Sequence, residues 1–448
     1  MKYKAYSEYK DSGIEWVGGV PSEWQVKPLF GVAATESVKN GDGAEANVLS
    51  LSYGNIIKRD VEDNFGLLPE SFNTYQLVKP GEIVLRLTDL QNDKRSLRVG
   101  QAKENGIITS AYLKLIAKRN QLNDSFLYRL LHSYDTTKVF YGMGGGLRQS
   151  MKFEEMRRLP VLVPSLAEQE KIANFLDHET AKIDTLIEKQ QQLIQLLKEK
   201  RQAVISHAVT KGLDPDVPMR NSGVEWLGEV PEHWVIAQLK FNTLEMQTGP
   251  FGSQLHAEDY IDDGIPLVNP AHMANGKIVP DSSVSVDRET WQRLKRYQLF
   301  EGDLIFARRG ELGRCAIVTA EQQGWLCGTG SLKAKLNDRL IPEYSYLLIS
   351  SEGVISELSL ESKGSTMENL NTETLGRIRI PVPPLTEQRL VLAYVNEIAS
   401  KFSNLIEKAN SAIELMNERR TALISAAVTG KIDVRNWQPP KTNTSEAA

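Results

Sequence analysis

The sequence of 448 residues has few of the features that mark a membrane or secreted protein. It contains two cysteines, Cys315 and Cys327, and a chain with so few cysteines and no export signal is typical of a reduced, cytosolic protein. No apolar run approaches the roughly 18 residues that a membrane-spanning helix needs. The first residues, MKYKAYSEYK, lack the apolar segment of a signal peptide. We therefore expect a cytoplasmic globular protein without a membrane segment.

The sequence also lacks an excess of positive charge. With 53 Lys and Arg against 57 Asp and Glu, the formal net charge is -4. The molecule as a whole is therefore not a basic nucleic-acid binder. Any DNA-binding role must depend on local basic patches or on a partner that supplies positive charge.

Signatures of catalysis are scarce as well. There is no GxxxxGK[ST] phosphate-binding loop, and neither the six histidines nor the two cysteines have the spacing of metal ligands. Phe140 to Gly146 satisfies an FxGxG pattern like the loop that binds S-adenosylmethionine, but a helix rather than a strand is expected before it. Asn269 to His272 lacks most of the NPP-aromatic motif of adenine methyltransferases and predicts a turn. We expect no catalytic residue, no metal and no cofactor.

What the sequence does contain is an internal repeat. Ser12 to Trp24 reads SGIEWVGGVPSEW, and Ser222 to Trp234 reads SGVEWLGEVPEHW. A second pair begins at Leu166, LAEQEKIANFLDHETAKIDTLIEK, and at Leu385, LTEQRLVLAYVNEIASKFSNLIEK, and aligns without a gap. The repeat predicts two tandem, pseudo-symmetric units, each with an opening anchor, a variable segment and a long helix.

The second repeated phrase predicts the long helices. Ser165 followed by Glu168 forms a capping-box pattern, and Glu387 places an acid in the first turn of the other helix. Gly212 and Gly430 stand where the helices should stop. Each helix would be about 65 Å long, too long to bury its apolar stripe in its own small domain, so the two should pair. Alternate steps of four and three predict a coiled-coil seam at Ile172, Leu176, Ile183, Leu186, Leu193, Leu197, Val204, Val391, Val395, Ile398, Phe402, Leu405, Met416 and Leu423.

The variable segments between anchor and helix predict mixed β and α structure. Residues 82–87 and 303–307 each follow a glycine turn and predict a strand. Residues 125–139 and 341–358 predict helices. The frame of the two units is therefore repeated, whereas the sequence inside the frame differs.

The repeated phrases resemble the specificity subunit of type I restriction–modification enzymes. The resemblance is carried by the paired SGIEWVGGVPSEW and SGVEWLGEVPEHW, the helix starts PSLAEQ and PPLTEQ, and the helix ends RQAVISHAVTKG and RTALISAAVTGK. GPFGSQLHAEDYIDDGIPLVNP from Gly249 and EGDLIFARRGELGRCAIV from Glu301 fit the same family. Residues 41–141 match only in outline.

The resemblance implies a DNA-binding subunit without catalysis of its own. In such proteins two target recognition domains of mixed α/β structure each read one half of a bipartite, asymmetric site on double-stranded DNA. Two long antiparallel coiled-coil helices separate them and bind two adenine-methylating modification subunits, and restriction subunits with translocase and nuclease activity join for cleavage. The implied fold class is α+β. The alternative is an orphan DNA-binding scaffold of the same fold without restriction partners.

On this resemblance the chain divides into five parts, and the variable segments are expected to carry the specificity. The parts are the N-terminal anchor with target recognition domain 1 (1–164), spacer helix 1 (165–212), the anchor repeat with target recognition domain 2 (213–383), spacer helix 2 (384–430) and a C-terminal tail (431–448).

Candidate DNA contacts are polar and basic residues on loops of the two recognition domains. Arg and Gln suit bidentate contacts to guanine and adenine, whereas Lys mainly meets phosphate. The candidates are Arg86, Lys94, Arg95, Arg98, Lys103, Arg148, Gln149, Ser253, Gln254, His256, Arg308, Arg309, Arg314, Lys363, Ser365 and Thr366.

Each of these candidates has an alternative interpretation. Basic side chains on loops can simply be solvated, and the stretches that contain Arg148 and Lys363 can be tight entries into the following helix. The four anchor tryptophans are interpreted as packing residues rather than as platforms for base stacking; they are Trp16, Trp24, Trp226 and Trp234.

Overall fold

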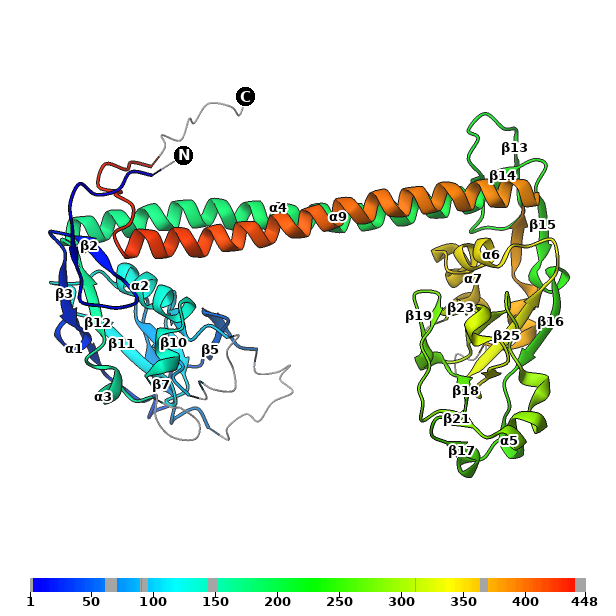
Figure 1. Cartoon of the computed structure of the whole chain (residues 1–448), viewed down its shortest axis with the longest axis horizontal. Coiled ribbons are helices and arrows are strands. Elements are labelled where there is room, and N and C mark those ends of the chain that lie inside the picture. Colours follow the sequence, from blue (N-terminus) through cyan, green and yellow to red (C-terminus); the bar gives the residue numbers. More distant parts are fainter. Residues whose placement is uncertain are drawn as a thin grey trace. The chain divides into compact units, whose positions relative to one another are not determined.

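The computed structural model describes residues 3–60, 71–88, 90, 96–143, 151–310, 312–362 and 370–439. The chain forms two compact units: unit 1 is Met1–Gln191 with Asn410–Ala448, and unit 2 is Gln192–Ala409. Two long helices, α4 (Leu166–Lys211) and α9 (Leu385–Val428), each contribute one part to unit 1 and one part to unit 2 (Figure 1).

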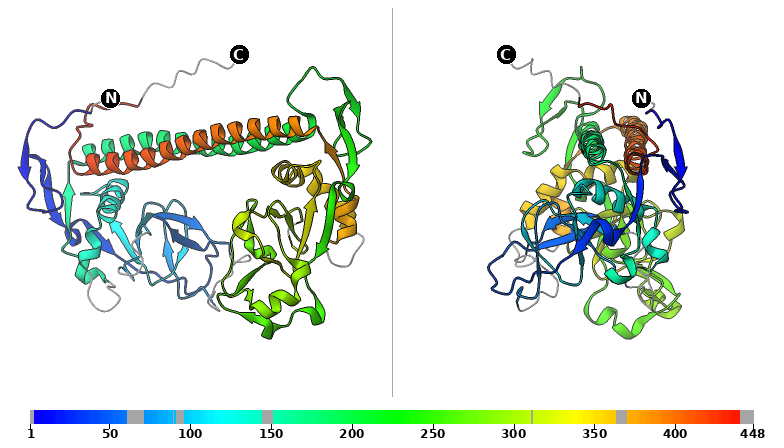
Figure 2. Two further views of the ribbon diagram at one scale, coloured as in Figure 1. Left: turned by 45° about the vertical axis from the view of Figure 1, so that its right-hand side comes forward. Right: turned by 90° about the vertical axis from the view of Figure 1, so that its left-hand side faces the viewer.

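Within each unit, α4 and α9 pack antiparallel (Figures 1 and 2). In unit 1 the start of α4 meets the end of α9, where Ile172 and Leu176 share a core with Leu423. In unit 2 the end of α4 meets the start of α9, where Val209 shares a core with Val391. The pairing buries apolar stripes that neither helix could bury alone.

The ends of the long helices lie where the sequence predicts them. Both helices end just before Gly212 and Gly430, whose φ angles of 80° and 74° are those of a helix stop. The predicted capping box is half formed. The Oγ of Ser165 accepts a hydrogen bond from the Glu168 N–H at 3.3 Å, but the Glu168 carboxylate binds side chains of the anchor instead of the Ser165 backbone.

The coiled-coil seam predicted from the sequence is longer than the part that is buried in the structure. Leu186, Leu193 and Leu405 have exposed fractions of 51%, 42% and 48%. A straight α-helix has 3.6 residues per turn, so positions spaced at 3.5 drift around its surface by about 20° per heptad. Of the other predicted positions, Ile172, Leu176, Ile183, Val391, Val395 and Leu423 are buried, and Leu197, Val204, Ile398, Phe402 and Met416 are half-buried.

Each unit is built on a four-stranded antiparallel sheet with the same strand order. In unit 1 the order is β4 (Ala33–Thr35), β11 (Leu113–Ala117), β8 (Ile83–Leu85), β9 (Val99–Gln101). In unit 2 it is β16 (Thr243–Thr248), β25 (Ser331–Leu336), β22 (Leu304–Ala307), β23 (Cys315–Ile317). Strands β8 and β22 confirm the predictions at 82–87 and 303–307. The variable segments therefore share one framework although their sequences share little.

Further strand pairs are also repeated. The pair β3 (Gln25–Pro28) and β12 (Pro160–Val163) has the register of β15 (Val235–Gln238) and β26 (Arg379–Val382). The anchors form the ribbons β1 (Tyr9–Asp11) with β2 (Gly19–Pro21), and β13 (Met219–Asn221) with β14 (Glu229–Pro231).

The remaining strands differ between the units. Unit 1 adds β5 (Leu49–Ser52) with β6 (Asn55–Lys58), and β7 (Gln76–Val78) with β10 (Gly106–Ile108). Unit 2 adds β17 (Tyr260–Ile261), β21 (Ser285–Val286), β18 (Ile265–Val268) and β24 (Leu326–Cys327) in one sheet, and the pair β19 (Met273–Ala274) with β20 (Lys277–Ile278).

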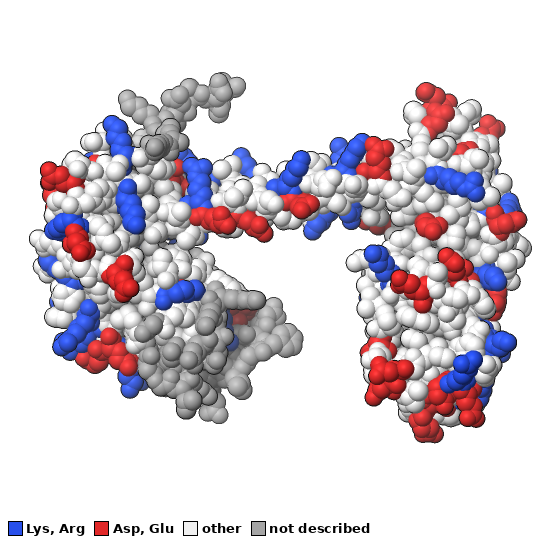
Figure 3. Space-filling model, viewed as in Figure 1, with Lys and Arg blue, Asp and Glu red and all other residues white. Residues whose placement is uncertain are grey.

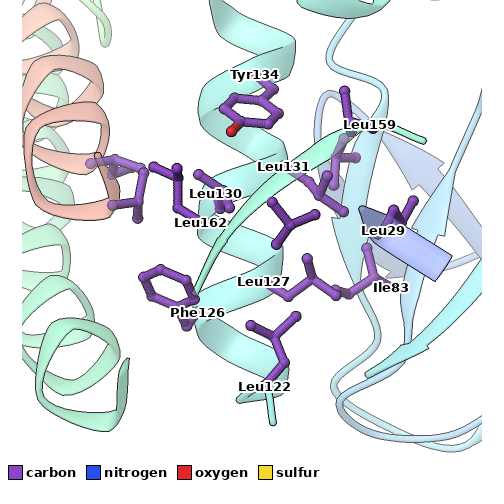
Figure 4. Close-up of a cluster of buried hydrophobic side chains, with 14 of the residues drawn as sticks. Leu29, Ile83, Leu122, Phe126, Leu127, Leu130, Leu131, Tyr134, Leu159 and Leu162 are labelled. Atoms are coloured by element: carbon purple, nitrogen blue, oxygen red, sulfur yellow. The ribbon is translucent and has the colours of Figure 1, made fainter. Parts of the chain in front are cut away.

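Helix α2 (Asp124–Thr136) confirms the helix predicted at 125–139 and forms the centre of the unit 1 core. Its Phe126 and Leu127 side chains are fully buried and pack with Leu29 and Ile83 (Figure 4). The segment predicted at 341–358 is two helices rather than one. The other helices are α1 (Leu29–Val32), α3 (Phe153–Met156), α5 (Arg288–Arg293), α6 (Pro342–Ile349), α7 (Glu352–Ser362) and α8 (Thr372–Arg377).

A buried lysine is repeated in the two central sheets. Lys114 on β11 donates from Nζ to the carbonyl oxygen of Leu77 at 2.9 Å and lies 3.2 Å from the Glu82 carboxylate. Lys333 on β25 donates to the carbonyl oxygen of Gln298, also at 2.9 Å. A buried charge needs such partners. The shared lysine was not predicted because the sequences around it diverge. The fold is α+β, with two pseudo-symmetric units and two long antiparallel helices, as predicted.

Candidate nucleic-acid interface

The second tryptophan of each anchor fixes that anchor to the start of a long helix. In unit 1, Nε1 of Trp24 donates to Oε1 of Glu168 at 3.1 Å, and the hydroxyl of Tyr6 donates to the same oxygen at 2.6 Å. In unit 2, Nε1 of Trp234 donates to Oε2 of Glu387 at 2.8 Å. Each unit thus holds its anchor with the same indole–carboxylate pair.

The glutamine that follows each of these glutamates is fully buried. Gln169 accepts from the Asn123 N–H at 2.7 Å and donates to the carbonyl oxygens of Gln121 and Pro164 at 3.0 and 2.8 Å. Gln388 makes the corresponding three bonds in unit 2, to the Ile341 N–H and to the carbonyl oxygens of Arg339 and Pro383. The repeated Glu-Gln pair therefore joins the helix start to the chain that leaves the central sheet.

The prediction that the tryptophans are packing residues is confirmed for Trp24 and Trp234, which are both buried. Trp16 is exposed on one side, and its ring meets the ring of Tyr134 edge-on at 6.1 Å. Trp226 is half-buried against Gly353 of α7. The repeated phrase is interpreted from the sequence as framework that seats each domain against the helices, but the residue pairs that do so were not identified, although the repeat of Glu-Gln in both copies was a usable signal.

The two ends of each central sheet have different surroundings. At the end that we call proximal, β11 and β25 lead to the residues that bind Gln169 and Gln388. At the opposite, distal end, β8 and β22 finish and β11 and β25 begin. The loops that follow β4 and β8 in unit 1, and β16 and β22 in unit 2, therefore leave their sheets at equivalent places.

In unit 2 the distal loops are held together by the turn that precedes β25. Gly249 donates from its N–H to the carbonyl oxygen of Ser331, and Arg308 donates to that of Gly330, both at 2.9 Å. The N–H of Gly330 in turn donates to Oδ1 of Asn269 at 3.2 Å. Three chain segments thus converge on this turn. The predicted turn at Asn269 is confirmed as a short 3-10 helix, Pro270–His272.

The loop after β16 presents its polar residues unequally. The side chains of Ser253 and His256 are exposed. Gln254 is half-buried, and its Oε1 accepts hydrogen bonds from the hydroxyl of Tyr297 at 2.7 Å and from the N–H of Phe251 at 3.2 Å. The carbonyl end of the Gln254 amide therefore stabilises the loop, which leaves Ser253 and His256 more available to a ligand.

The arginines after β22 also differ in exposure. Arg309 is exposed. Arg308 is half-buried and donates from Nε to the carbonyl oxygen of Leu370 at 3.3 Å, and burial lowers its pKa. Arg314 donates to the carbonyl oxygen of Pro270 at 3.3 Å and lines a cavity of about 530 Å³ with Tyr346.

In unit 1 the predicted basic cluster is divided. Arg86 follows β8 at the distal end and is half-buried. Lys103 is exposed but follows β9 at the proximal end, so it does not lie with Arg86. Seven candidates lie outside the described residues, namely Lys94, Arg95, Arg148, Gln149, Lys363, Ser365 and Thr366, as does part of the FxGxG stretch, residues 144–146.

Arg98 is a buried structural residue and not a surface contact. Its exposed fraction is 0%, Nη1 donates to the carbonyl oxygen of Thr88 at 2.9 Å, and its guanidinium lies 5.9 Å from the centre of the Tyr141 ring. Its backbone N–H donates to Asp135, whose own pKa is raised to about 6 by burial. The guanidinium thus faces the protein interior, which the sequence could not reveal.

Charge on the described surface is mixed. On the face that Figure 3 shows, Lys and Arg side chains alternate with Asp and Glu side chains over both units. Cys315 and Cys327 are buried, which raises the pKa of both thiols to about 12. Among the described residues, no His, Cys, Asp and Glu side chains gather into a group that could hold a metal ion, and no helix is long and apolar enough to cross a membrane.

Comparison with known protein families gives one consistent match. The family model of the type I restriction modification DNA specificity domain matches residues 98–196 and 247–415, more than half of the chain. The second stretch begins just before the glycine loop at Gly249, and together the two stretches include parts of both long helices.

Individual relatives agree with the family match. The chain is 22% identical over 339 residues to the type I restriction enzyme EcoBI specificity subunit of Escherichia coli, covering 75% of this chain and 71% of that one. It is 21% identical over 436 residues to the putative type I restriction enzyme MjaX specificity subunit of Methanocaldococcus jannaschii, covering 94% and 96%.

Solved structures show the same fold. A chain from a study of complex assembly and conformational transition of the type I R-M system superposes with a TM-score of 0.57 at 16% identity, covering 92% of this chain and 99% of that one. The HsdS subunit from Thermoanaerobacter tengcongensis superposes with a TM-score of 0.50 at 16% identity, covering 92% and 98%.

Proposed function

This chain belongs to the family of type I restriction–modification DNA specificity subunits, and we propose that it reads a bipartite double-stranded DNA site, one half through each unit. The observation that carries the proposal is the repeated framework. Each unit has the same central sheet, and candidate arginines follow the equivalent strand at its distal end, Arg86 after β8 and Arg308 and Arg309 after β22. Two equivalent frames with different loop sequences suit two readers of different half-sites.

The distal loops supply the groups that DNA recognition needs. Arg309 is exposed beside the turn that also holds the Ser253 loop, and arginine is the residue that most often binds guanine edges in the major groove. Ser253 and His256 add exposed polar groups. Because the chain has a net charge of -4, its overall charge does not attract the phosphate backbone, and we expect tight binding to require partners that contribute positive charge.

We propose that these partners are two adenine-methylating modification subunits, joined for cleavage by restriction subunits. In this proposal the chain selects the DNA site, and the other subunits carry out methylation and cleavage. The pairing of α4 with α9 leaves leucines exposed that a docked partner would bury, and burial of apolar surface favours association. These leucines are Leu186, Leu193, Leu196, Leu405 and Leu415.

The test is an exchange of one variable segment. Residues 31–158 are replaced with the equivalent segment of a relative, and the methylated site is mapped in cells that carry the matching modification subunit. One half of the site should change and the other half should stay. The exchange of residues 241–377 should change the other half. If either exchange alters both halves, the two units do not read separately.

A further inference from the structure

An exposed aromatic side chain stands on the distal loop of unit 2. Phe251 has an exposed fraction of 63%. Among the aromatic and cation–π contacts of the described residues, none involves this ring. Exposed apolar side chains are common on protein surfaces, so it is the position of this ring in the fold that decides what it can contact.

The loop that carries Phe251 is firmly built. Pro250 before it is buried, and Gly249 is bonded to Ser331 at the start of β25. The Phe251 N–H donates to Oε1 of Gln254, which is itself held by Tyr297. These hydrogen bonds fix the backbone that carries the ring. A ligand therefore needs to order little of this loop when it binds.

A second loop with an exposed cation leaves the same end of the sheet. Strands β16 and β22 both pair with β25, Thr248 opposite Leu332 and Ala307 opposite Ser331. Strands in a sheet lie about 4.8 Å apart, so the two loops leave within about 10 Å of each other. Arg309 is exposed on the second loop. An exposed cation on one loop and an exposed aromatic ring on its neighbour suit DNA, which offers charged phosphates next to apolar bases.

We propose that Phe251 is a DNA contact that inserts its ring against the bases of the half-site read by unit 2. This proposal rests on the proposed function. Apolar wedges of this kind enter a groove and partly unstack a base step, and contact between an aromatic ring and a base is worth enough to measure when it is removed. Phe251 would then be sensitive to base shape and stacking, while Arg309 contacts base edges or phosphate.

The chain contains a matched control. Phe241 has the same exposed fraction of 63% and also belongs to unit 2. It precedes β16, at the proximal end of the sheet, whereas Phe251 follows β16 at the distal end. Phe241→Ala removes an aromatic side chain of equal exposure from the same unit, together with the contact of its ring with Nζ of Lys240 at 5.2 Å. It therefore separates the effect of position from that of surface hydrophobicity.

The experiment measures DNA affinity of the full chain in complex with its modification subunits, on a duplex that carries the mapped site. Phe251→Ala should weaken binding about 5- to 100-fold, Phe251→Leu should restore part of it because an aliphatic wedge also inserts, and Phe241→Ala should have no effect. The slope of affinity against salt should be the same for Phe251→Ala and wild type, because no phosphate contact is lost. 2-Aminopurine placed along the unit 2 half-site should brighten at one step with wild type and lose that signal with Phe251→Ala.

Three results would contradict the proposal. Unchanged affinity and fluorescence with Phe251→Ala would show that the ring does not touch DNA. Loss of modification subunits from the complex, with DNA affinity preserved in the complexes that remain, would assign Phe251 to a protein interface. If wild type itself showed no preference for the site over random DNA, the proposed function would fail, and that result is separate from the other two.

Discussion

The backbone of Gly249 lies directly against the backbone of Gly328. A Cβ atom on Gly249 would lie 1.8 Å from the carbonyl oxygen of Gly328, so only glycine lets the loop after β16 meet the turn before β25. That contact positions the loop that carries Phe251. The loop that carries Arg308 is hydrogen-bonded to the same turn. The geometry of the distal end in unit 2 thus depends on a position without a side chain.

Gly249→Ala should disturb this contact. The methyl group must displace backbone rather than a flexible side chain, which we expect to cost about 2–4 kcal/mol and to weaken DNA binding at the unit 2 half-site. Thermal unfolding and DNA affinity measure the two effects. Gly41→Ala is the control, because a Cβ there has no neighbour within 4 Å. Equal stability of both variants would show that the loop and turn can separate freely.

Gln388→Leu should be strongly destabilising although it adds apolar surface. The substitution leaves the N–H of Ile341 and the carbonyl oxygens of Arg339 and Pro383 without their buried partner, at about 1–3 kcal/mol for each unsatisfied group. Gln169→Leu should behave alike in unit 1. Gln192→Leu on the exposed face of α4 should be nearly neutral in the same denaturant titration. If Gln388→Leu left the free energy of unfolding unchanged, water would have to take over the hydrogen bonds of the lost amide.

Arg309→Ala and Arg98→Ala should act in different ways. Arg309 is exposed, so its removal should leave the unfolding temperature unchanged and weaken DNA binding. If Arg309 meets phosphate, the salt slope should fall by about 1, and if it meets a base, selectivity at one position should relax. Arg98→Ala empties a buried site and should lower the unfolding temperature. Normal stability of Arg98→Ala would contradict its structural role.

His132 should make unit 1 sensitive to acid. Burial is the main cause that lowers its pKa to about 4, and the charge of Arg129 lowers it further. The unfolded chain, with a histidine pKa of about 6.5, binds more protons than the folded chain between pH 4 and 6.5. Stability from this residue is therefore present above pH 6.5 and is lost as the pH falls towards 4, by at most about 3 kcal/mol.

His132→Leu removes this titration and should flatten the fall in unfolding temperature between pH 6.5 and 4.5. Asp135, three residues after His132 on α2, shifts in the opposite direction because burial raises its pKa to about 6. Its contribution falls as pH rises through the same window, so the histidine effect is read as the difference between variant and wild type. Parallel pH profiles for the two proteins would show that the pKa of His132 does not change on folding.

The sequence by itself determined the repeat, the two long helices and their ends, and the strands at the centre of each unit. These features depend on local signals. The glycines at 212 and 430 stop a helix because their φ is positive, whatever surrounds them, and a glycine turn followed by an apolar run forms a strand.

Only the tertiary structure decided which candidate residues share a surface. Arg98, Lys103 and Arg309 look alike in the sequence, yet one is buried, one lies at the proximal end and one is exposed at the distal end. The seven-residue spacing likewise placed Leu186 and Leu193 in the seam. In the structure both are exposed, because positions at that spacing drift around a straight helix and away from its partner. Exposure and proximity depend on where distant segments return to the sheet, and no single stretch of sequence contains that information.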